Sequence, residues 1–188
     1  KKSLFQFHAE KIHNLQQRYE CVLPWYIMVS DANAAETEAF FREHGYFGLN
    51  SEDILFIKQR MVPSLDAQGK FMLEEKDRLA MNPNGHGGAI GAIVEGPVLE
   101  DARRRGIDTL SYFQVDNWAV KVAAPYFIGY HLQHNADMSS KNHRKRAPRE
   151  SVGVHCLCDG EYRVIEYSEL DIYPQLLETD AEGKVVYY

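Results

Sequence analysis

Cys21-Val-Leu-Pro-Trp-Tyr-Ile-Met-Val29 is a continuous apolar run that ends in the polar loop Ser30-Asp-Ala-Asn33. A strand that helices cover on both faces has such a run, because neither face meets water. Pro24 has no backbone N–H to donate to a neighbouring strand, which disfavours pairing at the beginning of the run and not at its end. We therefore predict a buried, parallel β-strand whose carboxyl end lies at Ser30.

Helical patterns lie on either side of this strand, and a second strand follows. Apolar residues recur at roughly helical spacing over residues 3–19, where Ser3 is suited to cap the N-terminus. We predict a second helix at about 34–44 and a second buried strand over Asp53–Gln59, which ends in a polar side chain. Strands separated by helices predict an α/β layer fold with a largely parallel central sheet.

The rest of the chain continues with helices, turns and one β-hairpin. Further helices are predicted at about residues 88–95, 98–105 and 125–135. Asp66–Gly69 is typical of a tight turn, and a short strand is predicted over Lys70–Leu73. The pattern over 152–166, interrupted by Asp159-Gly160, is typical of a β-hairpin, which we interpret as an excursion from the central sheet. A last strand is predicted over Lys184–Tyr188.

The composition is that of a soluble globular chain. Its 188 residues are 45% hydrophobic and 26% charged, which suits one domain or one large piece of a bigger domain. A formal net charge of -6 argues against general binding to nucleic acid or anionic membranes. No apolar run approaches the roughly 20 residues that span a bilayer, and no signal-peptide pattern follows Lys1. We expect neither a nucleic-acid partner nor a membrane partner.

Cysteine usage is sparse. Three cysteines, an odd number, argue against a disulfide framework and favour a reducing, cytoplasmic location. Cys156 and Cys158 alternate within a predicted strand and share one face, where thiols pack as small hydrophobic groups. We interpret this pair as core packing ahead of metal or redox chemistry. The dense basic run at 141–146 is interpreted as a solvated loop or an edge strand.

A third predicted strand ends in two polar residues. The stretch Asp108-Thr-Leu-Ser-Tyr-Phe-Gln-Val-Asp116-Asn117 has β-forming residues followed by a carboxylate and an amide. If residues 109–115 form a strand of the sheet, Asp116 stands at its carboxyl edge, where ligands of open α/β sheets bind. An ordinary Asp-Asn turn is the alternative, since both residues tolerate turn geometry. Asp116 is therefore a candidate for binding a cation or a polar ligand.

One glycine-rich loop, Asn82-Pro-Asn-Gly-His-Gly-Gly88, precedes the helix predicted at 88–95. Its glycines allow close approach of a ligand to the backbone, and the amides at the helix start suit a polar or anionic group. A simple turn is the commoner meaning of such a cluster. His86 as an ordinary loop histidine, and Gln59 as a solvated strand end, are the corresponding alternatives.

Short motifs in a fixed order link these positions. They are Pro24-Trp-Tyr-Ile-Met28, Phe40-Phe41, His44-x-Tyr-Phe-Gly-Leu49, Gln59 before Pro63, Gly69-Lys70 before Leu73-Glu74, Pro83-x-Gly-x-Gly-Gly88, Arg105-Gly106-Ile107, Val115-Asp116-Asn117, Val152-Gly153-Val154 and Glu166-Tyr-Ser-Glu169. The ordered set resembles the UDP-N-acetylglucosamine pyrophosphorylase family, whose relatives are the UDP-sugar and UDP-glucose pyrophosphorylases. The resemblance covers essentially the whole chain.

The resemblance implies a Rossmann-like nucleotide-diphospho-sugar transferase fold and uridylyl transfer. UTP and a sugar 1-phosphate, foremost N-acetylglucosamine 1-phosphate, would give a UDP-sugar and pyrophosphate. By this carry-over Gln59 reads uracil with an amide that both donates and accepts hydrogen bonds. Gly85 brings its backbone to the base, and His86 occupies the adjacent position that contacts nucleotide and sugar. Asp116 would be the catalytic residue and would face the phosphates through Mg²⁺, the cofactor.

The sugar side of the implied site departs from the pattern at one position. Gly153 and Glu166 would contact the sugar hydroxyls or the acetamido group. At His86 the acetylglucosamine enzymes usually carry Asn, whereas Gly-His-Gly resembles the UDP-glucose and UDP-sugar branches. Those activities are one alternative function, and a non-catalytic UDP-sugar-binding protein of the same fold is the other.

The resemblance also has consequences for the extent of the chain. The family's glycine-rich segment that cradles the UTP phosphates has no match within residues 1–188, and neither do its downstream motifs. We therefore expect 1–188 to be the central part of a single nucleotidyltransferase catalytic domain, without the N-terminal glycine-rich UTP-binding loop and the C-terminal part. These residues alone are expected not to catalyse uridylyl transfer.

Overall fold

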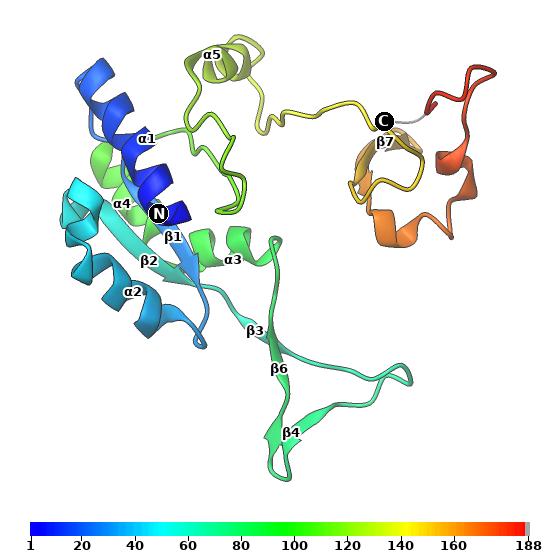
Figure 1. The fold of residues 1–188 in the computed structure, drawn as a ribbon, viewed down its shortest axis with the longest axis horizontal. Coiled ribbons are helices and arrows are strands. Elements are labelled where there is room, and N and C mark those ends of the chain that lie inside the picture. The colour runs from blue at the N-terminus through cyan, green and yellow to red at the C-terminus, as the bar shows by residue number, and fades with distance from the viewer. Residues whose placement is uncertain (187–188) are drawn as a thin grey trace. The chain divides into compact units, whose positions relative to one another are not determined.

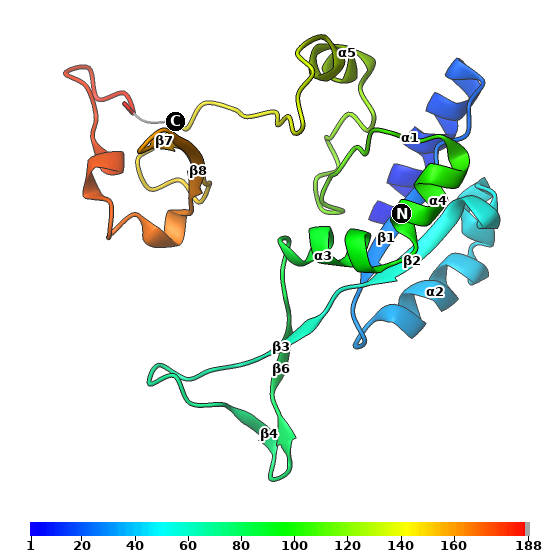
Figure 2. The same cartoon turned by 180° about the vertical axis from the view of Figure 1, so that it is seen from behind.

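The chain forms two compact units. The computed structural model describes residues 1–186 (Figures 1 and 2), and the first unit comprises Lys1–Pro125, while the second begins at Tyr126. Each unit is described separately below. That both belong to a single catalytic domain stays a prediction.

The first unit is built on a parallel pair of strands. β1 (Trp25–Val29) pairs with β2 (Ile54–Lys58) in a continuous register of five residue pairs. The ladder extends one residue further, because the backbone N–H of Gln59 donates to the carbonyl of Val29 at 2.9 Å. β1 begins directly after Pro24, as the missing N–H predicts. The two predicted buried strands are confirmed.

One face of the β1–β2 pair packs against α1 (Leu4–Tyr19) and α2 (Ala34–Glu43). The Ser3 hydroxyl caps α1 by accepting from the Gln6 N–H at 3.1 Å, which confirms the predicted start of the helix. The core residues of these elements are Ala9, Ile12, Trp25, Ile27, Val29, Ala34, Phe41 and Ile54. Phe41 is fully buried, with the rings of Phe5, Trp25, Phe47 and Phe56 around it.

The opposite face of the pair packs against α3 (Gly88–Glu95) and α4 (Val98–Arg105). Side chains that alternate with the first set along the strands form this second cluster, since successive residues of a strand point to opposite faces. It contains Tyr26, Met28, Ile57, Ala92, Ile93 and Val98. Helices therefore cover both faces of a parallel pair, and the predicted α/β class is confirmed.

A buried ion pair fastens α4 to the strands. Asp101, which is 6% exposed, accepts a hydrogen bond from the hydroxyl of Tyr26 at 2.8 Å and pairs with Arg105 at 2.9 Å. Arg105 also pairs with Asp53, just before β2, at 2.5 Å. Burial raises the pKa of Asp101, but hydrogen bonds from Tyr26, Arg105 and Arg104 outweigh it and hold the pKa below the ordinary 3.8. Burial, and then the bond to Asp101, raise the pKa of Tyr26 to about 12.

A long antiparallel ribbon leaves the first unit between β2 and α3 (Figure 1). Its inner strands are β3 (Met61–Pro63) and β6 (Met81–Pro83), and its outer strands are β4 (Leu73–Glu75) and β5 (Arg78–Leu79). The predicted turn is present, since the N–H of Gly69 donates to the carbonyl of Asp66 at 3.0 Å. The short strand expected over residues 70–73 begins later, at Leu73.

The strand predicted over residues 109–115 is wrong. The segment is extended but irregular, and no strand within residues 1–186 pairs with it. β-forming residues alone do not make a strand, because the backbone needs a partner about 4.8 Å away. Side chains hold the segment instead, among them Phe113, which packs on the first core cluster. Asp116 lies within a turn that the Asn117 N–H closes by donating to the Gln114 carbonyl, so the alternative of an Asp-Asn turn applies.

The second unit contains a helix and a β-hairpin. α5 (Pro125–Gln133) leads into an irregular segment and then into β7 (Val154–Cys158) and β8 (Glu161–Ile165). Asp159 and Gly160 make the turn with φ of 52° and 85°, as the tight hairpin geometry requires. The predicted hairpin is confirmed. Cys156 and Cys158 pack against its core of Val154, Ile165, Leu170 and Leu176, as the core-packing interpretation predicts.

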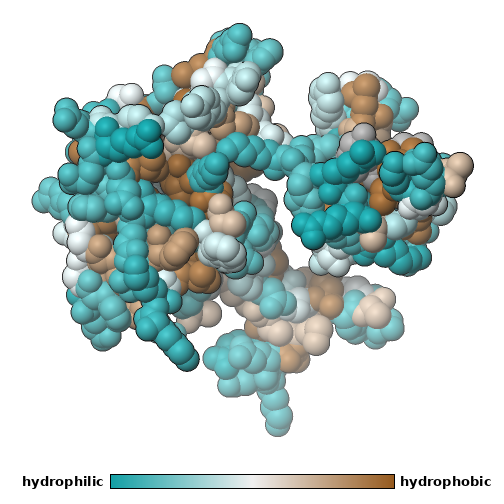
Figure 3. All heavy atoms as spheres, turned by 45° about the horizontal axis from the view of Figure 1, so that its top comes forward, coloured by the Kyte–Doolittle hydropathy of each residue, from teal (hydrophilic) through white to brown (hydrophobic). Residues whose placement is uncertain are grey.

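Short helices and bridges complete both units. The 3-10 helices are η1 (Gly45–Gly48), η2 (Ser51–Asp53), η3 (Tyr167–Glu169) and η4 (Pro174–Leu177). Of the last predicted strand, Val185 pairs with Thr179 as an isolated bridge, while residues 187–188 lie outside the described residues. All three cysteines are free thiols. Apolar side chains are interspersed with hydrophilic ones on the surface that Figure 3 shows. None of the helices within residues 1–186 is long and apolar enough to cross a membrane.

Replacing Asp101 with Asn tests the ion pair that fastens α4. The change removes the negative charge of Asp101 and leaves the largely buried Arg105 guanidinium without that partner. The free energy of unfolding should therefore fall by about 2–4 kcal/mol. Thermal and urea unfolding measure it. The control is Asp31→Asn, which removes an exposed ion pair to Lys58 and should cost under about 1 kcal/mol.

The same carboxylate predicts a pH dependence of stability. Because the pKa of Asp101 is lower in the folded state, its contribution is present above about pH 4 and is lost as the pH falls further. The stability difference between the wild type and Asp101→Asn should therefore shrink in that acidic range. A difference that stays constant from pH 7 to pH 3 would contradict the assignment.

Candidate functional site

Gln59 lies at the carboxyl end of β2 with an unsatisfied acceptor. Its backbone continues the ladder to Val29, which fixes the residue at the edge of the sheet. Its side-chain oxygen Oε1 is buried and has no hydrogen-bond partner among the residues that the structure describes. A buried acceptor without a donor costs about 1–3 kcal/mol, and a ligand N–H would remove that cost. The alternative of a solvated strand end does not describe this oxygen.

The glycine-rich loop lies against Gln59. Gly85 has a φ of 73°, a left-handed conformation that glycine adopts without strain. A Cβ at Gly88 would lie 3.1 Å from Cβ of Asn84 and 3.5 Å from Oε1 of Gln59, so a side chain on the first residue of α3 would require Asn84 to shift. The loop therefore brings its backbone close to the unsatisfied Oε1 of Gln59, while the predicted approach of a ligand to the loop stays a prediction.

His86 ties this loop to the segment before Asp116. Its Nε2 lies 3.0 Å from Nε2 of Gln114, and its Nδ1 lies 3.2 Å from the hydroxyl of Tyr112. Since the Gln114 nitrogen only donates, Nε2 of His86 accepts and Nδ1–H donates to Tyr112. Burial raises the pKa of the Tyr112 phenol. Both ring nitrogens of His86 are thus engaged, and a ligand would have to displace a partner to bind either one.

Asp116 presents a free carboxylate two residues after Gln114. The side chain is exposed and makes no hydrogen bond or ion pair with any residue in 1–186. No group of three or more His, Cys, Asp or Glu side chains in this range could hold a metal ion. Mg²⁺ in phosphate chemistry is commonly held by one or two carboxylates together with the substrate phosphates. A single free carboxylate fits such a shared site and does not form a complete site of its own.

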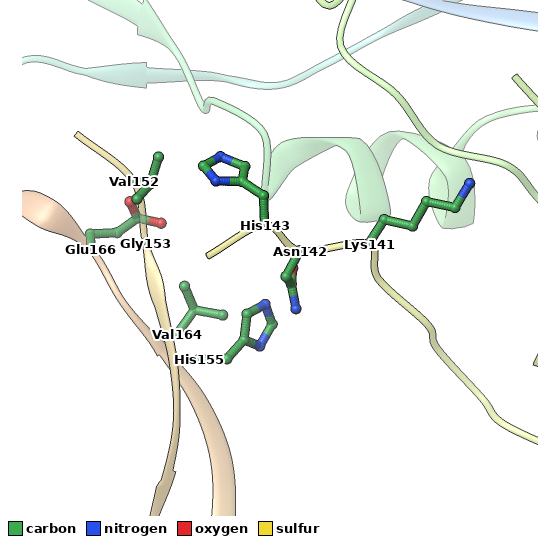
Figure 4. A pocket seen from close by; sticks show the side chains of 8 residues that line it. All are labelled: Lys141, Asn142, His143, Val152, Gly153, His155, Val164 and Glu166. Carbon is green, nitrogen blue, oxygen red and sulfur yellow. The ribbon is translucent and has the colours of Figure 1, made fainter. Parts of the chain in front are cut away.

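The second unit has a cavity of about 270 Å³ at the hairpin (Figure 4). It is lined by Lys141, Asn142, His143, Val152, Gly153, His155, Val164 and Glu166. A Cβ at Gly153 would lie 2.8 Å from Cγ1 of Val164 and 3.5 Å from the Glu166 carboxylate. Glu166 caps η3, and its N–H donates to the Glu169 carboxylate at 3.0 Å. The two predicted sugar residues therefore lie together, with Glu166 fixed by a capping box.

Several polar residues of this cavity were missed from the sequence. His143 and Asn142 belong to the basic run, which is a loop as expected, except that Lys145 is buried. The Lys141 side chain runs away from the other labelled residues (Figure 4), and its Nζ lies 4.8 Å from the ring centroid of Phe127. His155 was detectable, because it lies on β7 two positions after Gly153, which directly precedes the strand, and alternate residues of an extended chain share one face.

The predicted residues therefore form two groups. Gln59, Gly85 and His86 come together in the first unit, joined through Gln114 to the turn that carries Asp116. Gly153 and Glu166 come together in the second unit. The first group combines an unsatisfied amide, glycine backbone and a carboxylate, which suits a polar, phosphorylated ligand. The second combines a carboxylate with imidazole and amide groups, which suits a ligand rich in hydroxyl or amide groups.

Comparisons with known proteins identify relatives of this chain. The chain is 44% identical over 174 residues to UDP-N-acetylglucosamine pyrophosphorylase of Saccharomyces cerevisiae, covering 90% of this chain and 36% of the relative. It is 43% identical over 175 residues to UDP-N-acetylhexosamine pyrophosphorylase-like protein 1 of Xenopus tropicalis, covering 90% and 34%. The chain thus spans about a third of the length of these relatives.

The fold and the family agree as well. The crystal structure of uridine diphosphate N-acetylglucosamine pyrophosphorylase from Trypanosoma brucei, in complex with an inhibitor, matches with a TM-score of 0.85 and 32% identity. The match covers 99% of this chain and 39% of that one, and it supports the predicted Rossmann-like fold. The sequence profile of the UTP–glucose-1-phosphate uridylyltransferase family matches residues 1–180. The chain therefore belongs to the UTP–glucose-1-phosphate uridylyltransferase family.

Proposed function

We propose that this chain carries the uracil-binding and sugar-binding parts of an enzyme that makes a UDP-sugar and pyrophosphate from UTP and a sugar 1-phosphate. The observation that carries the proposal is the buried, unsatisfied Oε1 of Gln59 beside a glycine-rich loop in which Gly85 has a φ of 73°. The names of the relatives support N-acetylglucosamine 1-phosphate as the sugar substrate. Because the chain spans about a third of those relatives, the activity belongs to a longer protein.

Uracil suits the Gln59 side chain by its hydrogen-bonding groups. The imide of uracil has one N–H donor next to a carbonyl acceptor, and a glutamine amide offers the complementary acceptor and donor. Oε1 of Gln59 would accept from the imide N–H, while its Nε2 would donate to the neighbouring carbonyl. Gly85 has nothing within 4 Å of the place a Cβ would take, so its backbone is open to the base. Cytosine has no N–H at the matching ring position, so the pocket would select uridine nucleotides.

Asp116 would act at the phosphates. The reaction is an in-line attack of a phosphate oxygen of the sugar 1-phosphate on the α-phosphorus of UTP, with pyrophosphate as the leaving group. Mg²⁺, when bound, would neutralise charge on the phosphates, and we propose Asp116 as its protein ligand. The free carboxylate of Asp116 at the surface of the first unit supports this role.

The sugar choice has a second candidate. Glu166 and Gly153 in the cavity of the second unit would bind the sugar hydroxyls or the acetamido group. Glucose 1-phosphate is the alternative substrate, favoured by the Gly85-His86-Gly87 sequence and by the description of the family. The ratio of kcat/KM for the two sugar phosphates decides between them. Binding of UDP-sugar without any turnover would favour a non-catalytic binding protein.

We also propose a cytoplasmic location. None of the three cysteines forms a disulfide bond, which suits a reducing compartment. Fractionation of cells, followed by immunodetection, tests this location.

Gln59→Ala tests the uracil assignment. The change removes both hydrogen bonds to the base, so UDP-sugar binding should weaken by about 1–3 kcal/mol. Calorimetric titration of the full-length wild type and variant measures it. Gln68→Ala, in the exposed turn of the ribbon, is the matched control and should leave the affinity unchanged. Equal affinities of the wild type and Gln59→Ala would exclude this role for Gln59.

Asp116→Asn tests the phosphate role. Because the exposed side chain makes no hydrogen bond or ion pair within residues 1–186, the melting temperature should stay nearly unchanged. The activation free energy of turnover should rise by about 2–4 kcal/mol, so kcat falls. Asp108→Asn, an exposed carboxylate in the same segment, is the control and should keep its activity. Normal turnover of Asp116→Asn at limiting Mg²⁺ would rule out the assignment.

Gly153→Ala tests the sugar cavity. The new methyl would lie 2.8 Å from Cγ1 of Val164 and close to Glu166, so one of them must shift. We expect the KM for the sugar 1-phosphate to rise roughly tenfold, about 1.4 kcal/mol, with little change in the KM for UTP. Gly129→Ala in α5, where a Cβ meets nothing within 4 Å, is the control. A rise confined to the KM for UTP would contradict the sugar assignment.

A further inference from the structure

We propose that His8 and Lys11 of α1 are positioning residues that hold the turn carrying Asp116. The structural part of this inference concerns the turn at residues 114–120, which no strand pairing fixes. Its catalytic part rests on the proposed function, since it assumes that Asp116 acts on the phosphates.

His8 binds the N-terminal side of the turn at residues 114–120. It is fully buried, and its Nε2 lies 2.8 Å from the carbonyl oxygen of Val115, which is 107 positions away in the chain. A carbonyl oxygen only accepts, so Nε2 carries the proton and donates. The imidazole also packs on the ring of Phe113 with centroids 4.9 Å apart. A buried ring and a buried hydrogen bond therefore fix the residue that precedes Asp116.

Packing alone does not explain a histidine at this position. With Nε2 protonated, Nδ1 is an acceptor, and it is buried without a partner among residues 1–186. A Leu or Phe side chain would fill the same interior without that unsatisfied nitrogen, whose burial is unfavourable. The group that distinguishes His8 from an apolar residue is thus the N–H that binds the Val115 carbonyl. Unsatisfied groups of this kind concentrate where function opposes stability.

Lys11 binds the C-terminal side of the same turn. Its Nζ donates to the carbonyl oxygens of Trp118 and Val120, the latter at 2.8 Å. Phe7, on the same face of α1, contacts the Trp118 ring with centroids 6.3 Å apart. Residues three or four apart share one face of a helix, so these side chains act together. Partial burial lowers the pKa of Lys11.

Asp116 lies between these two attachments. The backbone is held at Val115 and at Trp118, and three turn hydrogen bonds, donated by the amides of Asn117, Trp118 and Val120, close the loop between them. α1 itself is fixed by Ala9 and Ile12 in the core. The carboxylate of Asp116 is thus free to bind while its backbone is fastened to a rigid helix. Such preorganisation matters because a misplacement of about 1 Å can cost about a hundredfold in rate.

The experiment compares His8→Leu with His8→Gln in the full-length protein. Leu fills space but donates nothing, whereas the amide nitrogen of Gln can replace Nε2 as the donor to Val115. We expect kcat to fall about 10- to 100-fold in His8→Leu with the KM for UTP little changed, and Gln to restore most of it. His13→Leu, an exposed histidine on the same helix, is the matched control and should match the wild type.

A double variant separates positioning from general structural damage. If His8 acts through Asp116, then His8→Leu should lower kcat much less in an Asp116→Asn background than in the wild type. A loss of the same size in both backgrounds would overturn the proposal. So would equal kcat in His8→Leu and the wild type, or no rescue by Gln.

Hydrogen exchange tests the attachment without any activity. The amides of residues 117–120 should exchange faster in His8→Leu and at about the wild-type rate in His8→Gln. If the wild-type protein does not turn over UTP with sugar phosphates, the proposed function fails, while the exchange rates still decide whether His8 holds the turn. Unchanged exchange in His8→Leu would overturn the attachment itself.

Discussion

The parallel pairing of β1 with β2 is the constraint on which the first unit depends. Among residues 1–186 these are the only two strands that pair in parallel, and helices cover both of their faces. The carboxyl ends of parallel strands meet at the same edge of the sheet. The backbone hydrogen bond from Gln59 to Val29 therefore places Gln59, the residue proposed to bind uracil, at that edge. Within the first unit, the glycine-rich loop contacts Gln59 at this edge, and the turn that carries Asp116 is bonded to α1, which covers one face of the pair.

The first unit contains buried polar groups that have partners and buried polar groups that have none. Asp101 and Arg105 are buried, but each has charged and hydrogen-bonding partners, and they fasten α4. Oε1 of Gln59 and Nδ1 of His8 are buried without partners among residues 1–186. A folded chain satisfies its buried polar groups wherever stability alone decides. Oε1 of Gln59 lies beside the glycine-rich loop, and His8 contacts the turn that carries Asp116. These are the two places in this unit where a ligand is proposed to bind.

The sequence predicted those elements that local patterns encode. α1, β1, β2, α3 and the hairpin follow from periodicity, caps and turn residues within a few positions of each other. The prediction of a strand over residues 109–115 was wrong, because a β-forming composition also suits an extended segment held by remote side chains. The contact that decides the matter, His8 to Val115, spans 107 positions and leaves no local pattern. His143 was missed for a related reason, since a charged run is usually solvated.

His86 shows how far the geometry changes a residue's meaning. The sequence interpretation made it a direct contact to nucleotide and sugar, yet Tyr112 and Gln114 already occupy both of its ring nitrogens. Those partners belong to the segment that ends in Asp116, so His86 couples the glycine-rich loop to the turn that carries Asp116. An Asn at this position has a shorter side chain and could not reach both partners with the same loop shape. Any influence of position 86 on the choice of sugar would then act through the shape of the loop.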